Sequence, residues 1–225
     1  MPTRRAVFLD AMGTLVHCPD PAGALWGLLR DAGFPEEPQR VGVALRAEIA
    51  YYRAHMHTAV DAASLDDMWR RCCAVLAAEL RNPPPPDMVA DLLRRAFTFV
   101  AYPEVDATLT RLRERGVALA VVSNWDVGLT MHLDALDRTS RFDAVVVSAV
   151  VGVPKPDAEI FHTACRAVGV APGDALHCGD DAANDRDGAE AAGLHAVLLD
   201  RSGATPGAIT SLGELPARVE AWLAG

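Results

Sequence analysis

Lysine is almost missing from this sequence of 225 residues, because Lys155 is the only lysine among its 21 basic residues. Chemistry that needs a primary amine therefore has one side-chain candidate. Long apolar runs are also missing, and none reaches the roughly 18 residues that a membrane-spanning helix needs. Asp10 interrupts the N-terminal stretch before the apolar core of a signal peptide can develop. We expect a cytoplasmic protein with no membrane partner.

Cysteine is sparse and unpatterned. The five cysteines are odd in number and show neither CxxC spacing nor the density of a disulfide scaffold, so reduced and mostly buried thiols are expected. They are Cys18, Cys72, Cys73, Cys165 and Cys178. The seven histidines form no metal-ligand pattern either, and each is interpreted as structural; they are His17, His55, His57, His132, His162, His177 and His195.

Positive charge is in deficit, since 30 acidic residues outnumber the basic ones and give a net charge of −9. The arginines are scattered along the chain, so the basic patch of a nucleic-acid-binding protein is missing and no nucleic-acid partner is expected. Hydrophobic residues make up 51% of the chain and charged residues 23%, which is typical of globular proteins and excludes wholesale disorder. The length fits one domain that carries a modest insertion.

Short apolar runs alternate with segments of helical periodicity, which is typical of βαβ units. The runs lie at 6–9, 117–122, 144–147, 175–178 and 196–199. Runs that are apolar on both faces suit a parallel sheet covered by helices on each side. The sequence therefore predicts an α/β fold, and ligands of such sheets bind beyond the carboxyl ends of the strands.

About a hundred residues separate the first two of these runs, where a single crossover helix would suffice. Helical spacing within this segment predicts helices at 24–31, 38–57, 64–81 and 87–100. Ser64 and Asp67 are interpreted as a capping box, and the prolines at 83–86 as a stiff connector. We expect a helical cap domain over residues 17–100, inserted into a core domain formed by residues 1–16 and 101–225.

Helices are also predicted at 128–136, 156–168, 182–192 and 215–224. Pro156 is expected at a first helical position. Gly169 and Gly193 are expected just past helix ends, where glycine is favoured.

Polar residues follow four of the predicted strands. Asp10 comes after the first strand, Ser123 and Asn124 after the second, Lys155 after the third, and the acidic segment 180–185 after the fourth. Each residue alone is an ordinary turn or cap residue. The chance occurrence of such residues at four successive strand ends of one sheet is improbable. Two carboxylates about 4 Å apart would repel by roughly 4 kcal/mol at an effective dielectric near 20, so convergence calls for a cation. Oxygen ligands point to Mg²⁺.

With these motifs the sequence resembles the haloacid dehalogenase (HAD) superfamily over about residues 5–200. The four motifs stand at Asp10–Leu15, Ser123-Asn124, Lys155-Pro156-Asp157 and Gly179-Asp180 followed by Asp185. The resemblance implies a Rossmann-like core with a helical cap inserted after the first motif. It also implies a hydrolase that acts on a small, phosphorylated substrate.

The resemblance further implies the roles of single residues. Asp10 would be the nucleophile, and Lys155 would neutralise it and the substrate. Substrate would be held by Thr14, Ser123 and Asn124. Mg²⁺ would be held by Asp10, the backbone carbonyl of Met12, Asp180 and Asp185. An aspartate that attacks phosphorus divides one difficult hydrolysis into two steps, and positioned positive charge stabilises the equatorial oxygens.

Met12 departs from the phosphatases of this superfamily, which carry a second aspartate there as acid and base, a role commonly worth about 10²–10⁴-fold in rate. A phosphatase with a good leaving group or another proton relay is the first hypothesis. The second is a 2-haloacid dehalogenase, which also lacks this aspartate but is metal-independent and lacks the acidic arrangement of residues 179–185. A non-catalytic binding protein is the third. Phosphonoacetaldehyde hydrolysis is excluded, because residues 17–100 contain no lysine for a Schiff base.

Overall fold

The computed structural model describes residues 4–225, which divide into two compact units. The first unit combines the chain up to His17 with Ala101–Gly225, and the second is Cys18–Val100. At the boundary, β2 (Val16–His17) and β3 (Val100–Ala101) form a two-stranded sheet. Among the described residues, none of the helices combines the length and the apolar character that a membrane crossing requires.

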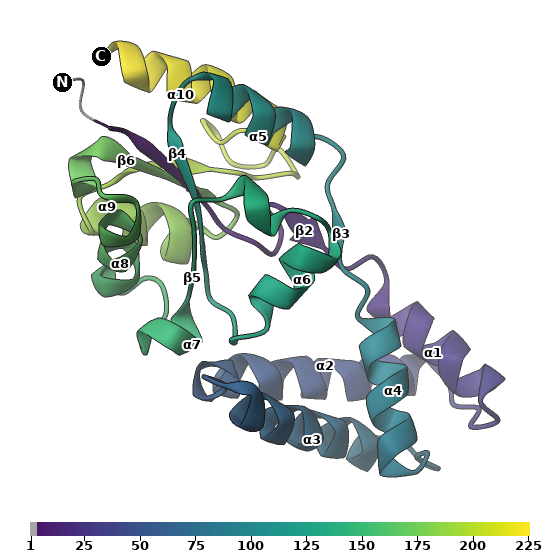
Figure 1. The fold of residues 1–225 in the computed structure, drawn as a ribbon. Helices are drawn as coiled ribbons and strands as arrows, with labels where there is room; N and C mark the ends of the chain where they lie inside the picture. Colours follow the sequence, from purple (N-terminus) through teal and green to yellow (C-terminus); the bar gives the residue numbers. More distant parts are fainter. Residues whose placement is uncertain (1–3) are drawn as a thin grey trace. The chain divides into compact units, whose positions relative to one another are not determined.

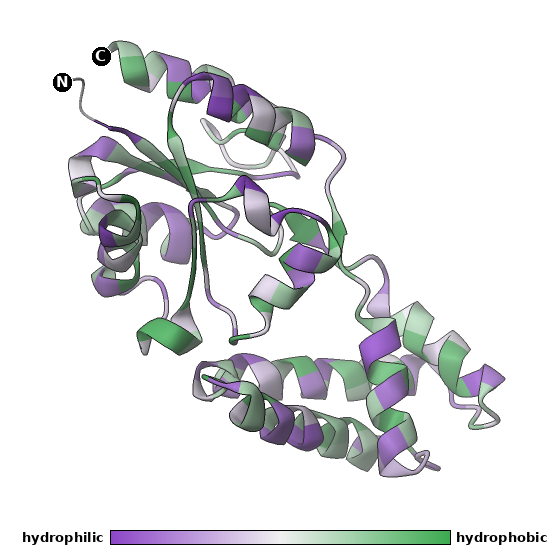
Figure 2. Ribbon diagram, in the orientation of Figure 1, coloured by the Kyte–Doolittle hydropathy of each residue, from purple (hydrophilic) through white to green (hydrophobic). Residues whose placement is uncertain are grey.

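The first unit is built on a five-stranded parallel sheet in the order β5-β4-β1-β6-β7. Its strands are β1 (Ala6–Leu9), β4 (Ala118–Ser123), β5 (Ala144–Val147), β6 (Ala175–Gly179) and β7 (His195–Leu198). Apolar residues run along these strands, as Figure 2 shows. The predicted α/β fold with a central parallel sheet is confirmed, and β1, the strand that Asp10 follows, lies in its centre.

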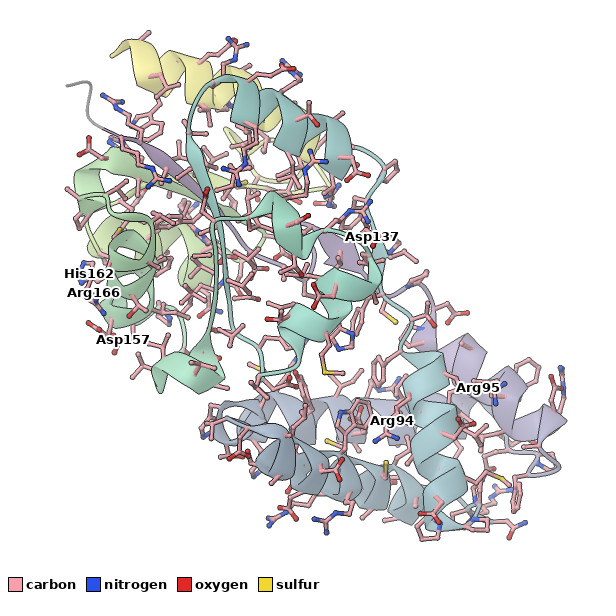
Figure 3. The ribbon with its side chains drawn as sticks, viewed as in Figure 1. Arg94, Arg95, Asp137, Asp157, His162 and Arg166 are labelled. Atoms are coloured by element: carbon pink, nitrogen blue, oxygen red, sulfur yellow. The ribbon has the colours of Figure 1, made fainter. Side chains whose placement is uncertain are left out.

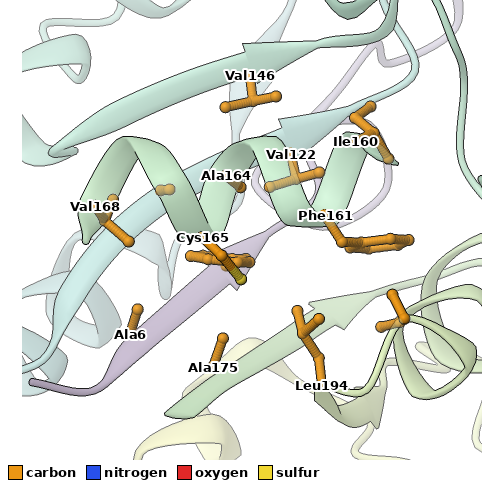
Figure 4. Close-up of a cluster of buried hydrophobic side chains, with 14 of the residues drawn as sticks. Ala6, Val122, Val146, Ile160, Phe161, Ala164, Cys165, Val168, Ala175 and Leu194 are labelled. Atoms are coloured by element: carbon orange, nitrogen blue, oxygen red, sulfur yellow. The ribbon is translucent and has the colours of Figure 1, made fainter. Parts of the chain in front are cut away.

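Helices cover both faces of the sheet (Figure 1). In this unit they are α5 (Val105–Glu114), α6 (Leu129–Ala135), α7 (Ser148–Val151), α8 (Ala158–Val168), α9 (Gly188–Ala191) and α10 (Leu215–Ala224). Helix α5 packs against α10, whereas α8 packs across β1, β4 and β5. Figure 4 shows Ile160 and Phe161 of α8 in the same buried cluster as Val122 and Val146 of the strands.

Two details of α8 differ from the prediction. The helix begins at Ala158 and not at Pro156, because the Asp157 carboxylate (Figure 3) caps it by accepting the Glu159 N–H at 2.9 Å. Pro156 therefore precedes the helix. Gly169 ends α8 with φ +73°, as predicted, and a glycine tolerates this left-handed conformation at little cost.

The segment predicted as one helix over 182–192 consists of a π-helical stretch at Ala182–Asp187 followed by α9. The Asp181 side chain accepts hydrogen bonds from the N–H groups of Ala183 and Asn184. The wider turn starts directly behind the acidic end of β6, and π-helical turns are frequent at functional sites. Gly193 follows with φ +84°.

The second unit is helical. It contains α1 (Pro21–Asp31), α2 (Pro38–His55), α3 (Ala62–Glu79) and α4 (Pro86–Ala96). Its apolar core includes Leu25, Leu45, Leu76 and Leu93, one from each helix. The prolines at 83–86 lie between α3 and the first turn of α4, where a connector was predicted.

The ends of the helices in the second unit differ from the prediction by a few residues, as α3 and α4 illustrate. Ser64 pairs with Asp61 and not with Asp67, because α3 begins earlier, and the two residues form the capping box reciprocally. Helix α4 ends at Ala96, where the prediction runs to Val100; the β-branched and aromatic residues that follow lead into β3.

Candidate functional site

Asp10 follows β1 directly and is held within the sheet. Its backbone N–H donates to the carbonyl of Cys178 at 3.0 Å, and the residue is 7% exposed. Its Oδ1 atom accepts two hydrogen bonds, from Ser123 Oγ at 2.9 Å and from Lys155 Nζ at 2.6 Å. Burial raises the pKa of Asp10, Lys155 opposes this shift, and the charge of Asp185 adds to it.

Lys155 is 4% exposed, and its ammonium group has an acceptor for each of its protons. It donates to Asp10 Oδ1 at 2.6 Å, to Asp185 Oδ1 at 2.5 Å and to the carbonyl of Val122 at 3.0 Å. Burial by itself would lower the pKa of this group, but the two carboxylates hold it above its ordinary value. The one lysine of the chain is therefore a charged group placed between two acids.

Asn124 fixes the backbone of Lys155. Its Oδ1 accepts the Lys155 N–H at 2.7 Å, and its Nδ2 donates to the Lys155 carbonyl at 3.0 Å. The reciprocal pair ties the end of β4 to the loop that carries the lysine. In this structure the Asn124 amide thus positions Lys155, and its predicted contact with substrate stays a prediction.

Asp185 is 2% exposed and accepts hydrogen bonds at both oxygens. Oδ1 accepts from Lys155 and from His177 Nε2, the latter at 2.9 Å, and Oδ2 accepts the Asp181 N–H at 2.9 Å. Burial alone would raise the pKa of Asp185, but the His177 hydrogen bond and the Lys155 charge hold it well below the ordinary range. Asp185 is therefore ionised and holds the lysine in place.

His177 lies on β6 with no exposed surface. Because a carboxylate only accepts, Nε2 carries the proton that faces Asp185, and Nδ1 has no hydrogen-bond partner within residues 4–225. Burial lowers the pKa of His177, so the ring is neutral. From the sequence, all histidines were interpreted as structural, but His177 contacts the acidic cluster. The sequence signal for this contact was its position two residues before Gly179, at the end of a predicted strand.

Carboxylate oxygens of Asp10, Asp180 and Asp185 lie within 4.8 Å of one another. Partial burial, together with the charges of Asp10 and Asp185, raises the pKa of Asp180 to about 6. Two glycines permit this crowding. A Cβ on Gly13, which has φ +80°, would meet Asp180 Oδ2 at 2.0 Å, and a Cβ on Gly179 would meet Asp185 Cγ at 2.1 Å. The carboxylates can therefore lie this close together at the sheet edge because Gly13 and Gly179 have no side chains to occupy the same space.

The predicted residues of the first motif lie on the segment after Asp10. Thr14 is fully buried, and its hydroxyl has no hydrogen-bond partner in the described part of the chain. Met12 forms a bridge with Val16 at the start of the turn. Substrate binding by Thr14 and metal binding by the Met12 carbonyl stay predictions.

The family model described as haloacid dehalogenase-like hydrolase matches residues 4–193. Haloacid dehalogenase-like hydrolase domain-containing protein 3 of Mus musculus is 38% identical over 116 residues, which are 52% of this chain and 46% of that protein. The chain thus spans about half the length of curated relatives of this kind. A plasmid-encoded phosphoglycolate phosphatase of Cupriavidus necator is 30% identical over 92% of this chain and 86% of its own length.

A similar fold occurs in the HAD-hydrolase YfnB of Bacillus subtilis, whose crystal structure contains magnesium. The two chains superpose with a TM-score of 0.74 over 97% of this chain and 99% of that one, at 18% sequence identity. This likeness establishes the shared fold.

Proposed function

Because the chain belongs to the haloacid dehalogenase-like hydrolases, we propose that it hydrolyses a small phosphorylated metabolite with Asp10 as the nucleophile. The observation that carries the proposal is the contact of Lys155 with both Asp10 and Asp185 at the carboxyl edge of the sheet, beside Asp180. The phosphoglycolate phosphatase of similar length supports the phosphatase activity.

The hydrogen bonds of Asp10 suit nucleophilic attack. Ser123 and Lys155 both donate to Oδ1, which leaves Oδ2 to form a bond to phosphorus while the bond to the leaving oxygen breaks. Water then attacks phosphorus, releases inorganic phosphate and restores the Asp10 carboxylate. The leaving oxygen takes up one proton and the attacking water gives up one. Lys155 stays protonated throughout, and its charge offsets that of the phosphoryl oxygens.

The donor set of the site fits Mg²⁺. Its three carboxylates offer oxygen alone, and burial together with the charges of Asp10 and Asp185 raises the pKa of Asp180, so a cation would favour its ionised form. We assign the ion to Asp10, Asp180, Asp185 and the Met12 carbonyl. When bound, Mg²⁺ would supply positive charge against the phosphoryl oxygens. The magnesium in the Bacillus subtilis structure supports this assignment.

Met12 shapes the choice of substrate, because a thioether cannot donate a proton to the leaving oxygen. We therefore expect phosphate compounds with a good leaving group, such as acyl phosphates, or a proton relayed through water. In this proposal residues 17–100 form the helical cap, and the compact helical unit Cys18–Val100, inserted after the first motif, supports that role.

Met12 also favours a second candidate, the 2-haloacid dehalogenase, because halide leaves without a proton. The clustered carboxylates of Asp180 and Asp185 argue against it, since carbon–halogen hydrolysis by Asp10 gains nothing from further negative charge at the nucleophile.

Release of inorganic phosphate from a panel of phosphate esters and acyl phosphates, with and without Mg²⁺, tests the proposal beside release of chloride from 2-chloropropionate. We expect Mg²⁺-dependent phosphate release that falls to background in Asp10→Asn. The matched control is Asp91→Asn, which removes an exposed carboxylate on α4 and leaves the rate unchanged. Chloride release alone would favour the dehalogenase. Silence in both assays, unchanged from Asp10→Asn, would contradict the proposed phosphatase and favour a binding protein.

A further inference from the structure

Arg201 lies just after β7, beyond the segment that the family model matches. Its guanidinium group reaches back to the turn that follows Asp10. Nε donates to the carbonyl of Gly13 at 2.9 Å, and Nη2 donates to the carbonyl of Thr14 at 3.0 Å. Two adjacent backbone carbonyls are therefore held by one planar group, in a geometry that a lysine cannot reproduce.

The remaining contacts of Arg201 come from the segment at which the chain re-enters the first unit. Nη1 donates to Glu104 Oε1 at 2.7 Å, and the guanidinium carbon lies 3.4 Å from the centre of the Tyr102 ring. Although burial opposes it, this hydrogen bond lowers the pKa of Glu104. The Arg201 and Glu104 side chains are 25% and 22% exposed, so the pair is largely shielded from water.

The same two chain segments also contact each other directly. The Tyr102 N–H donates to the Leu15 carbonyl at 3.1 Å, and the Tyr102 ring stacks on His17 with ring centres 4.5 Å apart. Arg201 thus joins the segment that leaves the first unit after Asp10 to the segment that returns.

Fixing a carbonyl fixes the whole peptide plane, because the amide bond is planar. Gly13 packs against the Asp180 carboxylate so closely that no Cβ fits between them. A rotation of the peptide planes at Gly13 and Thr14 would therefore move backbone atoms toward or away from the acidic cluster. The hold of Arg201 on these carbonyls opposes that rotation.

We propose that Arg201 is a positioning residue: it fixes the backbone of Gly13 and Thr14 between Asp10 and Asp180 and ties this turn to both segments that connect the two units. The effect on catalysis rests on the proposed phosphatase function, whereas the effect on the backbone does not.

Hydrogen exchange and kinetics of Arg201→Gln and Arg201→Lys test the proposal, with Arg218→Gln as the matched control. Arg218 lies on α10 and donates to the carbonyl of Gly207 at an exposed site. We expect both Arg201 variants to exchange the amides of residues 13–17 and of Tyr102, Glu104 and Val105 about tenfold faster or more, with β1 and β6 unchanged. With p-nitrophenyl phosphate, kcat should fall about tenfold at a KM within about twofold of wild type.

Lysine should rescue neither measurement, because a single ammonium cannot bind both carbonyls in their plane. Unchanged exchange at residues 13–17 in Arg201→Gln, or full rescue by lysine, would overturn the proposal. Faster exchange with unchanged kcat would overturn the positioning role. If wild type releases no phosphate, the proposed function fails while the exchange result still decides the role in the backbone.

A third variant covers the case in which both Arg201 variants fail to fold. Tyr102→Leu keeps the hydrogen bonds of Arg201 and removes the stacked ring. We expect a smaller increase in exchange at the same amides, and no increase would overturn the proposal.

Discussion

Replacing Lys155 with methionine keeps an unbranched side chain as far as Cε and removes the ammonium group between Asp10 and Asp185. Unit charges 2.6 Å apart, the distance from Lys155 Nζ to Asp10 Oδ1, attract by roughly 6 kcal/mol at an effective dielectric near 20. The cost of burying the ammonium offsets part of this gain. Removing one partner of a buried pair costs about 3–5 kcal/mol, and we expect Lys155→Met to lower the free energy of unfolding by that amount at pH 7.

The loss should depend on pH in a definite direction. Without the ammonium, the folded-state pKa of Asp10 rises further above its unfolded value, because Lys155 no longer opposes the effects of burial and of the Asp185 charge. Between the unfolded and folded pKa values the native state binds more protons, so the stability of the variant falls as pH rises. The difference from wild type should therefore be smaller at pH 5 than at pH 7.

Urea denaturation of both proteins at pH 5 and pH 7 measures this difference. The control is Arg166→Met, which breaks an exposed pair with Glu159 and should cost no more than about 1 kcal/mol. Adding Asp185→Asn to Lys155→Met should restore part of the stability. A loss equal to that of Arg166→Met, or one that is the same at both pH values, would refute the reasoning.

Two further predictions concern Asp180 and His177 in the site, and one concerns Glu48, a buried residue on α2. The pKa of Asp180, raised to about 6, implies native-state stability that is lost as pH rises from about 4 through 6. Asp180→Asn should therefore raise the Tm at pH 8 without metal and lose the increase that Mg²⁺ gives to wild type; an unchanged response to Mg²⁺ would contradict the assignment. Glu48 is 3% exposed, and burial raises its pKa to about 7. Wild type should thus lose on the order of 2 kcal/mol between pH 5 and 8.5 by urea denaturation, Glu48→Gln should lose less, and the exposed control Glu79→Gln should behave as wild type. His177→Gln keeps a donor for Asp185 and should retain more phosphatase activity than His177→Leu, whose kcat we expect to fall about tenfold; equal activities would show that the hydrogen bond is dispensable.

The sheet and the acidic cluster could be predicted from two local patterns: continuous apolar runs that form strands, and polar residues directly after those runs. The runs at 6–9 and 144–147 coincide with β1 and β5, since buried parallel strands are continuously apolar. Asp10, Lys155 and Asp180 follow strands of one parallel sheet, so their approach required only that the carboxyl ends meet at one edge.

The direction in which individual side chains of the site point could not be predicted from the sequence. The sequence did not indicate that the Asn124 amide forms hydrogen bonds with the backbone of Lys155. His177 is one polar residue in an apolar strand. It contacts the site only through its hydrogen bond to Asp185, which the π-helical turn brings back to β6. Arg201 contacts residues almost two hundred positions earlier in the chain, and no local pattern encodes such a contact.

The position of the single lysine has a spectroscopic consequence. Protein grown with ¹⁵N-labelled lysine would carry one labelled side-chain nitrogen, and that nucleus lies within hydrogen-bond distance of both Asp10 and Asp185. Its three protons are shielded from solvent and bonded, which slows their exchange with water. A single resonance would then follow the charge at the centre of the site, free of overlap from any other ammonium side chain in the molecule.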